Sequence, residues 1–113
     1  MTVKDLMDMH LFELKNPGDT SDSEREITQP FCCDLLSVAM GKAPAGCAWV
    51  TVMANINTLA VASLADAACV ILAEDTQIDD VTLQKAVQQG ITLFSTPMPI
   101  FEAALSIYKA LNP

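Results

Sequence analysis

Two adjacent cysteines, Cys32 and Cys33, are the residues of this chain best suited to covalent chemistry. A helix is predicted to begin at Asp34, and the partial positive charge at a helix N-terminus stabilises a thiolate. The pair could therefore act as a thiol redox sensor. However, Asp34 would oppose thiolate formation, and cysteine is a common small residue of protein cores. We favour packing for this pair, and more strongly for Cys47 and Cys69 on predicted core strands.

Three polar residues, Asn55, Asn57 and Thr96, fall where predicted strands end and loops begin. In an α/β sheet, ligands bind beyond the carboxyl ends of the strands. These three residues therefore form a candidate ligand-binding site. The competing interpretation of Asn57 is structural, because an asparagine there could cap the helix that follows.

A metal centre or a catalytic base is harder to find in the sequence. The carboxylates of Glu74, Asp75, Asp79 and Asp80 could hold Mg²⁺ or Ca²⁺, but their spacing fits no EF-hand and acidic residues at a helix start are ordinary caps. His10 is the only histidine, and no serine or threonine has a histidine or lysine base at a recognisable spacing. We expect no metal, no cofactor and no enzyme activity.

Composition restricts the class of protein. The 113 residues include 14 Asp and Glu against 6 Lys and Arg, for a net charge of -8. This balance argues against nucleic-acid binding, since phosphate contacts require clustered Lys and Arg. Hydrophobic residues reach 51% and charged residues only 18%. So few charges predict buried surface beyond that of one core, and therefore an oligomer.

Residues 43–65 carry no formal charge, which raises the question of a membrane span. A span needs roughly 20 predominantly apolar residues, and this stretch is interrupted by Pro44, Gly46 and Asn55, among others. We expect no membrane segment. The first residues lack the pattern of a signal peptide, and the cysteine spacing matches neither a disulfide framework nor a zinc site. A cytoplasmic protein is expected.

Hydrophobic periodicity predicts alternating helices and strands. We expect helices at 2–9, 34–40, 58–65, 79–89 and from 99 onward, and strands at 11–14, 27–31, 47–53, 69–73 and 91–94. Gly41 and Gly90 are expected as left-handed helix caps. The last helix shows one apolar stripe, formed by Phe101, Ala104, Leu105, Tyr108 and Leu111. This order predicts an α/β sheet with helices on both faces.

Many short blocks of the sequence, in order and at matching distances, resemble the DRTGG domain family. They include Arg25-Glu26-Ile27-Thr28, Asp34-Leu35-Leu36-Ser37, Ala48-Trp49-Val50-Thr51, Ala60-Val61-Ala62-Ser63 and Phe101-Glu102. The resemblance implies one domain over residues 1–113, related to the N-terminal domain of the bacterial HPr kinase/phosphorylase. The implied fold is a three-layer α/β/α arrangement, and with the strands predicted above we expect a mixed sheet of about five strands.

The same resemblance implies a non-catalytic accessory module that pairs into dimers. Small stand-alone proteins of this kind accompany iron-hydrogenase and redox genes in anaerobic bacteria. The chain departs from the family motif at Gln29 and Pro30, which stand where two glycines are usual. Because proline has no N–H to turn toward an anion, we do not expect this loop to bind phosphate.

Three functional hypotheses follow. The first is a regulatory or scaffold module without catalysis, acting as a homodimer and linked to anaerobic redox or hydrogenase metabolism through a protein partner. Its dimer contact would be the helix at 58–65, which is apolar nearly all round. The second is a sensor of a nucleotide or another small metabolite at Asn55, Asn57 and Thr96. The third is a thiol redox sensor at Cys32 and Cys33.

Overall fold

One antiparallel and four parallel strands form the central sheet of the computed structural model, which describes residues 1–19 and 24–113. The strands lie in the order β1-β5-β4-β3-β2. Only β1 runs antiparallel to its neighbour, β5. Their bounds are β1 Glu13–Pro17, β2 Pro30–Cys32, β3 Ala48–Thr51, β4 Cys69–Leu72 and β5 Thr92–Ser95.

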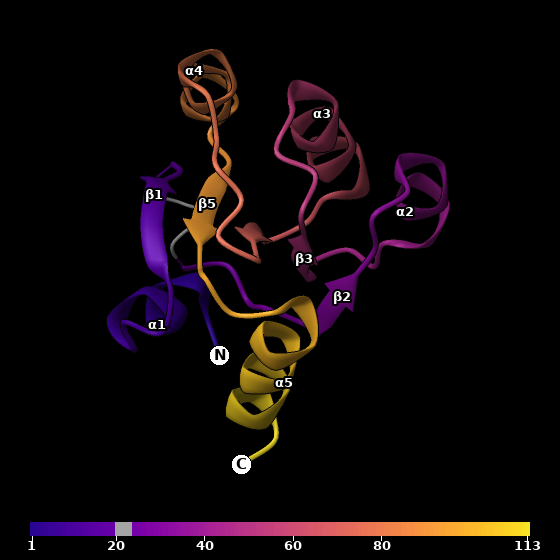
Figure 1. Ribbon diagram of the computed structural model, residues 1–113. Coiled ribbons are helices and arrows are strands. Elements are labelled where there is room, and N and C mark those ends of the chain that lie inside the picture. The colour runs from indigo at the N-terminus through magenta and orange to yellow at the C-terminus, as the bar shows by residue number, and fades with distance from the viewer. Residues whose placement is uncertain (20–23) are drawn as a thin grey trace.

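Five helices cover the two faces of this sheet in the described ranges. They are α1 Val3–Asp8, α2 Leu36–Lys42, α3 Ile56–Ala65, α4 Asp80–Gln89 and α5 Ile100–Leu111. From β2 to β5 each connection advances by one strand in the same direction. Because such crossovers are right-handed, α2, α3 and α4 share one face, and α1 and α5 cover the other (Figure 1). The expected three-layer α/β/α fold with a mixed five-stranded sheet is confirmed.

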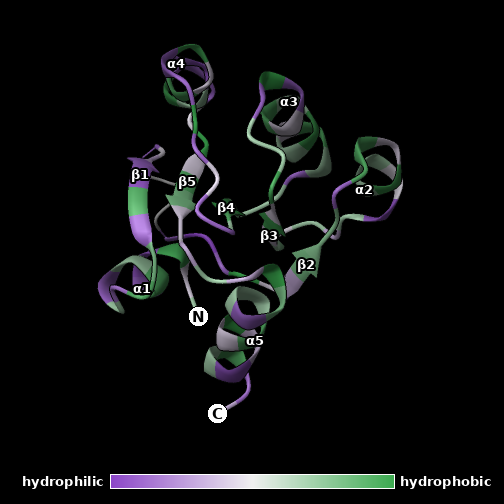
Figure 2. Ribbon diagram, viewed as in Figure 1, coloured by the Kyte–Doolittle hydropathy of each residue, from purple (hydrophilic) through white to green (hydrophobic). Residues whose placement is uncertain are grey.

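The central strands are buried on both sides, and their residues alternate between two cores. Trp49, Val70 and Leu93 pack toward α2, α3 and α4, whereas Val50 and Phe94 pack toward α1 and α5. Strands covered on both faces need apolar residues at successive positions, and Figure 2 shows β3 and β4 in the hydrophobic colours. The uncharged stretch at 43–65 therefore contains a core strand and α3. No helix in the described part of the chain is long and apolar enough to cross a membrane.

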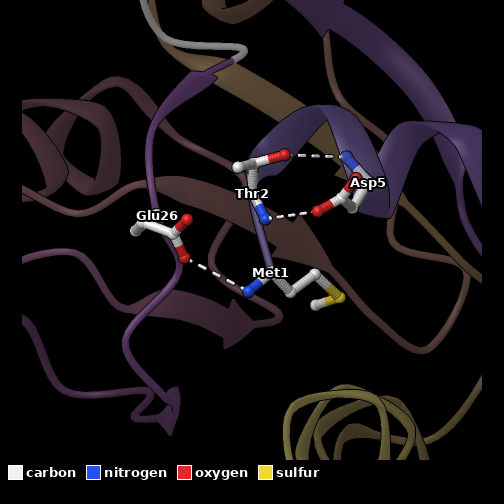
Figure 3. A network of polar contacts seen from close by, with 4 residues as sticks. All are labelled: Met1, Thr2, Asp5 and Glu26. Carbon is white, nitrogen blue, oxygen red and sulfur yellow. Dashed lines mark hydrogen bonds and ion pairs between the residues drawn. The ribbon is translucent and has the colours of Figure 1, made fainter.

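The first residues are held by hydrogen bonds to a segment distant in sequence (Figure 3). The Asp5 N–H donates to the Thr2 hydroxyl at 3.1 Å, and the Thr2 N–H donates to the Asp5 carboxylate at 2.9 Å. This capping box confirms Thr2 as the start of the first helix, and its hydrogen bonds hold the pKa of Asp5 below its usual value. The Met1 ammonium lies 3.2 Å from Glu26, and the Val3 N–H donates to the Arg25 carbonyl.

Both edges of the sheet discourage pairing with another strand. The strand β2 has three residues and begins at Pro30, which has no N–H to offer. At the opposite edge, the register of β1 shifts between Leu14 and Asn16, and the strand ends at Pro17. Short, irregular or proline-containing edges prevent strand addition. Both edges are therefore poorly suited to pairing with a strand of another chain.

Two expectations for the glycines have different outcomes. Gly90 ends α4 in the left-handed conformation, with a φ of 68°, as predicted. The prediction for Gly41 is wrong, because α2 starts two residues later than expected and continues through this glycine to Lys42. The helix closes instead at Ala43, whose N–H donates to the Ala39 carbonyl.

Only part of the apolar stripe that the sequence shows on the last helix, α5, packs against the core. Phe101 is 72% exposed and Tyr108 is 55% exposed, whereas the buried residues of the helix are Ala103, Ala104 and Ile107. The side with Ala103 and Ile107 and the side with Phe101 and Tyr108 are both apolar and both have helical spacing. Periodicity therefore does not distinguish the buried side from the exposed one. The structure selects the alanine side because small residues let the helix approach a sheet already filled by large side chains.

Candidate functional site

Asn55 caps α3, and the expectation that Asn57 does so is wrong. The Asn55 side-chain oxygen accepts a hydrogen bond from the Thr58 N–H at 3.0 Å. Asn55 has the extended backbone of a cap, and the helix begins immediately after it at Ile56. Asn57 therefore lies in the first turn of α3 with its side chain exposed.

Thr96 is buried just beyond β5 and connects two loops at the carboxyl edge of the sheet. Its N–H donates to the Leu72 carbonyl, and its carbonyl accepts from the Asp75 N–H. Its hydroxyl accepts from the Met98 N–H at 3.2 Å. Thr96 thus holds the loop after β5 against the loop after β4.

The three predicted ligand-binding residues share one edge of the sheet but follow two different strands. Thr96 follows β5 and Asn55 follows β3, with β4 between them. Neighbouring strands lie about 4.8 Å apart, so these strand ends are separated by roughly 10 Å. Asn55 and Thr96 both bond the backbone of their own chain. None of the three residues lines the cavity found in the described part of the protein.

A hydrogen-bonded connection that the sequence did not reveal joins the ends of β2 and β3. The Asp34 carboxylate accepts from the Thr51 hydroxyl at 2.7 Å and from the Val52 N–H at 3.1 Å. One residue earlier, the Cys33 carbonyl accepts from the Trp49 indole N–H at 3.0 Å. Trp49 and Thr51 are fully buried. Partners 16 to 18 residues apart leave no local pattern, so only the folded chain identifies them.

The two adjacent thiols lie at the same place and have different surroundings. Cys32 ends β2 and is exposed, whereas Cys33 is half-buried against the core beneath α2, and its thiol donates to the Leu35 carbonyl at 3.3 Å. The helix expected to stabilise a thiolate begins at Leu36, beyond Asp34. Burial, and then the charge of Asp34, raises the pKa of the Cys32 thiol. This direction is opposite to that of a reactive thiolate.

The acidic residues after β4 serve the ends of helices. Glu74 accepts from the Ile100 N–H at the start of α5, at 3.4 Å, and Asp79 accepts from the Thr82 N–H at 2.7 Å. The second bond holds the pKa of Asp79 below its ordinary value. Across residues 1–19 and 24–113, no group of three or more histidine, cysteine or acidic side chains could hold a metal ion.

One cavity of the described structure lies at the opposite, amino edge of the parallel strands. Its lining includes Arg25, Ser63, Asp66, Gln89 and Thr92. The Arg25 guanidinium donates to the Asp66 carboxylate at 2.7 Å and to the Asp66 carbonyl at 2.6 Å. The bond to the carboxylate, together with the charge of Arg25, lowers the pKa of Asp66. The two bonds also place a cation at the C-terminus of α3, where a helix favours one. The volume is about 140 Å³, well below the roughly 300–1,000 Å³ of typical small-molecule sites.

No protein-family model matches the chain, and no curated protein matches its sequence. The resemblance to the DRTGG family therefore stays a prediction from short blocks of sequence.

The two asparagines give a direct test of the assignment at α3. Replacing Asn55 with alanine removes the acceptor for the Thr58 N–H, and loss of such a cap costs about 1 kcal/mol of unfolding free energy. The matched variant Asn57→Ala should change that free energy by less than about 0.5 kcal/mol, because its side chain is exposed. Urea denaturation measures both values. A larger loss for Asn57→Ala than for Asn55→Ala would contradict the assignment.

Alkylation followed by mass spectrometry should separate the four thiols. Cys32 should react first in the native protein, slowly at neutral pH and faster as the pH rises, because its raised pKa limits the thiolate. Burial raises the pKa of Cys47 to about 11 and raises that of Cys69 further. Both should react only after unfolding. Rapid alkylation of Cys32 below neutral pH would instead indicate an activated thiolate and would favour the redox-sensor hypothesis.

Proposed function

We propose that this protein is a non-catalytic regulatory or scaffold module that works as a homodimer. The observation that carries the proposal is the exposure of large apolar side chains on the outer surfaces of the helices. Large apolar residues are exposed there, including Leu35, Val38, Leu64, Phe101 and Tyr108. Exposed apolar side chains gathered on rigid elements are typical of protein–protein contacts.

The distribution of charge along the chain indicates which surfaces could form a contact between two copies. Copies with a net charge of -8 repel one another, so a dimer contact should avoid carboxylates that have no basic partner. Between Asp34 and Asp66 the chain has no acidic residue and a single basic one, Lys42. Helices α2 and α3 lie side by side within that interval. Their outer surface, with Leu35, Val38 and Leu64, is one candidate contact, and α5 is the other.

The two alternative functions have weaker support. A nucleotide is far larger than the cavity of about 140 Å³, and the three residues expected to bind it do not line that cavity. The Cys32 thiol has a raised pKa, which disfavours a reactive thiolate.

The partner and the metabolic context of the proposed module come from the resemblance alone. The resemblance favours a module that meets a protein of a redox enzyme system. The acidic composition, the interrupted apolar stretch and the cysteine pattern favour a cytoplasmic protein that binds neither nucleic acid nor membrane.

Sedimentation velocity at micromolar concentration tests the homodimer. We expect a species of about twice the 12.1 kDa chain mass. Added salt should strengthen the dimer, because it screens repulsion between the two acidic copies while apolar contact persists. A monomer across the micromolar range, with and without salt, would contradict the proposed function.

A further inference from the structure

The outer face of α5 carries two aromatic side chains two helical turns apart. Phe101 and Tyr108 are separated by seven positions, and both are exposed. Seven residues at 3.6 per turn bring a helix back to within about 20° of the same direction. The half-buried Leu105 lies between them. The three side chains therefore form one apolar stripe along the helix, here called the α5 stripe.

A pair of opposite charges runs beside the α5 stripe with the same spacing. Glu102 and Lys109 are also seven positions apart, and both are exposed. On the helix they lie about 80–100° around from Phe101, on the flank away from Ala104. Neither forms an ion pair within the part of the chain that the structure describes. The helix α5 thus has one acidic and one basic residue on a chain of net charge -8.

From this arrangement we infer that two copies of the chain pair through α5, antiparallel, about a two-fold axis at Leu105. This inference rests on the proposed homodimer and names its contact. The symmetry places Phe101 opposite Tyr108 of the second copy on one flank and Glu102 opposite Lys109 of the second copy on the other. Each contact occurs twice, as a two-fold interface requires. Leu105 meets its own equivalent at the centre.

The face formed by α2 and α3 fits a second copy less specifically. Its exposed residues on α3 are mainly aliphatic or small, with Ile56 and Leu64 the largest, and no pair of opposite charges on α3 would fix an orientation. Aromatic anchors carry much of the binding energy at protein interfaces, and opposite charges select the register. The expectation that α3 forms the dimer contact thus becomes the competing assignment.

The size of the contact sets its expected strength. A helix of 12 residues is about 18 Å long. A pairing confined to such a helix buries less than the roughly 800 Å² per partner of a standard interface. The dimer should therefore dissociate in the micromolar range, which analytical ultracentrifugation covers.

Charge reversal tests the pairing. The single variants Glu102→Lys and Lys109→Glu each place like charges opposite one another at two positions, and each should raise the dimer dissociation constant about tenfold or more. The double variant, with both substitutions, restores opposite charges and should return the constant to within about threefold of the wild type. Circular dichroism verifies that each variant is folded.

A matched pair of apolar substitutions separates this contact from the α2–α3 surface. Phe101→Ser and Leu64→Ser remove side chains that are 72% and 74% exposed. We expect only Phe101→Ser to weaken the dimer, by about tenfold or more. A wild-type dimer that dissociates with Leu64→Ser and is unaffected by the α5 variants would overturn the α5 assignment and leave the homodimer intact. A wild-type monomer would overturn both.

Discussion

Burial of both faces of β3 and β4 is the constraint on which the rest of this structure depends. All four residues of each strand are buried, and nearly all of them are apolar, so helices are required above and below the sheet. The three crossovers from β2 to β5 supply α2, α3 and α4 on one face, and α1 and α5 close the other. Trp49 on one side and Phe94 on the other fill the two cores.

This arrangement uses the polar residues at the sheet edges to join loops and to begin helices. Asp34 joins the ends of β2 and β3, Thr96 joins the loops after β4 and β5, and Asn55 starts α3. At the other edge, Arg25 binds the end of α3 through Asp66. Side chains that might have met a ligand are thus engaged in holding the fold. The exposed surface of the helices includes large apolar side chains as well as charged ones.

Local patterns in the sequence predict much of the fold. Thr2 and Gly90 act at helix ends as expected, because a cap is decided by the few residues around it. Helix boundaries are less predictable where two candidates stand close together. Asn55 and Asn57 could both cap α3 by residue type. The extended backbone of Asn55, immediately before Ile56, assigns the cap to Asn55. Asn55 and Thr96 lie at the carboxyl edge of the sheet as predicted, whereas the hydrogen bonds that they form were not predicted.

The sequence by itself determined the fold class, the alternation of helices and strands and the scarcity of chemical groups, since these follow from composition and short-range periodicity. Only the tertiary structure decided which apolar side of α5 is buried. Apolar residues occur on more than one side of this helix, and the sheet accepts the side with Ala103, Ala104 and Ile107 because the small alanine side chains permit close packing. Phe101 and Tyr108 are therefore on the surface. Contacts between residues far apart in the chain, such as Asp34 with Thr51, were likewise decided by the meeting of strands.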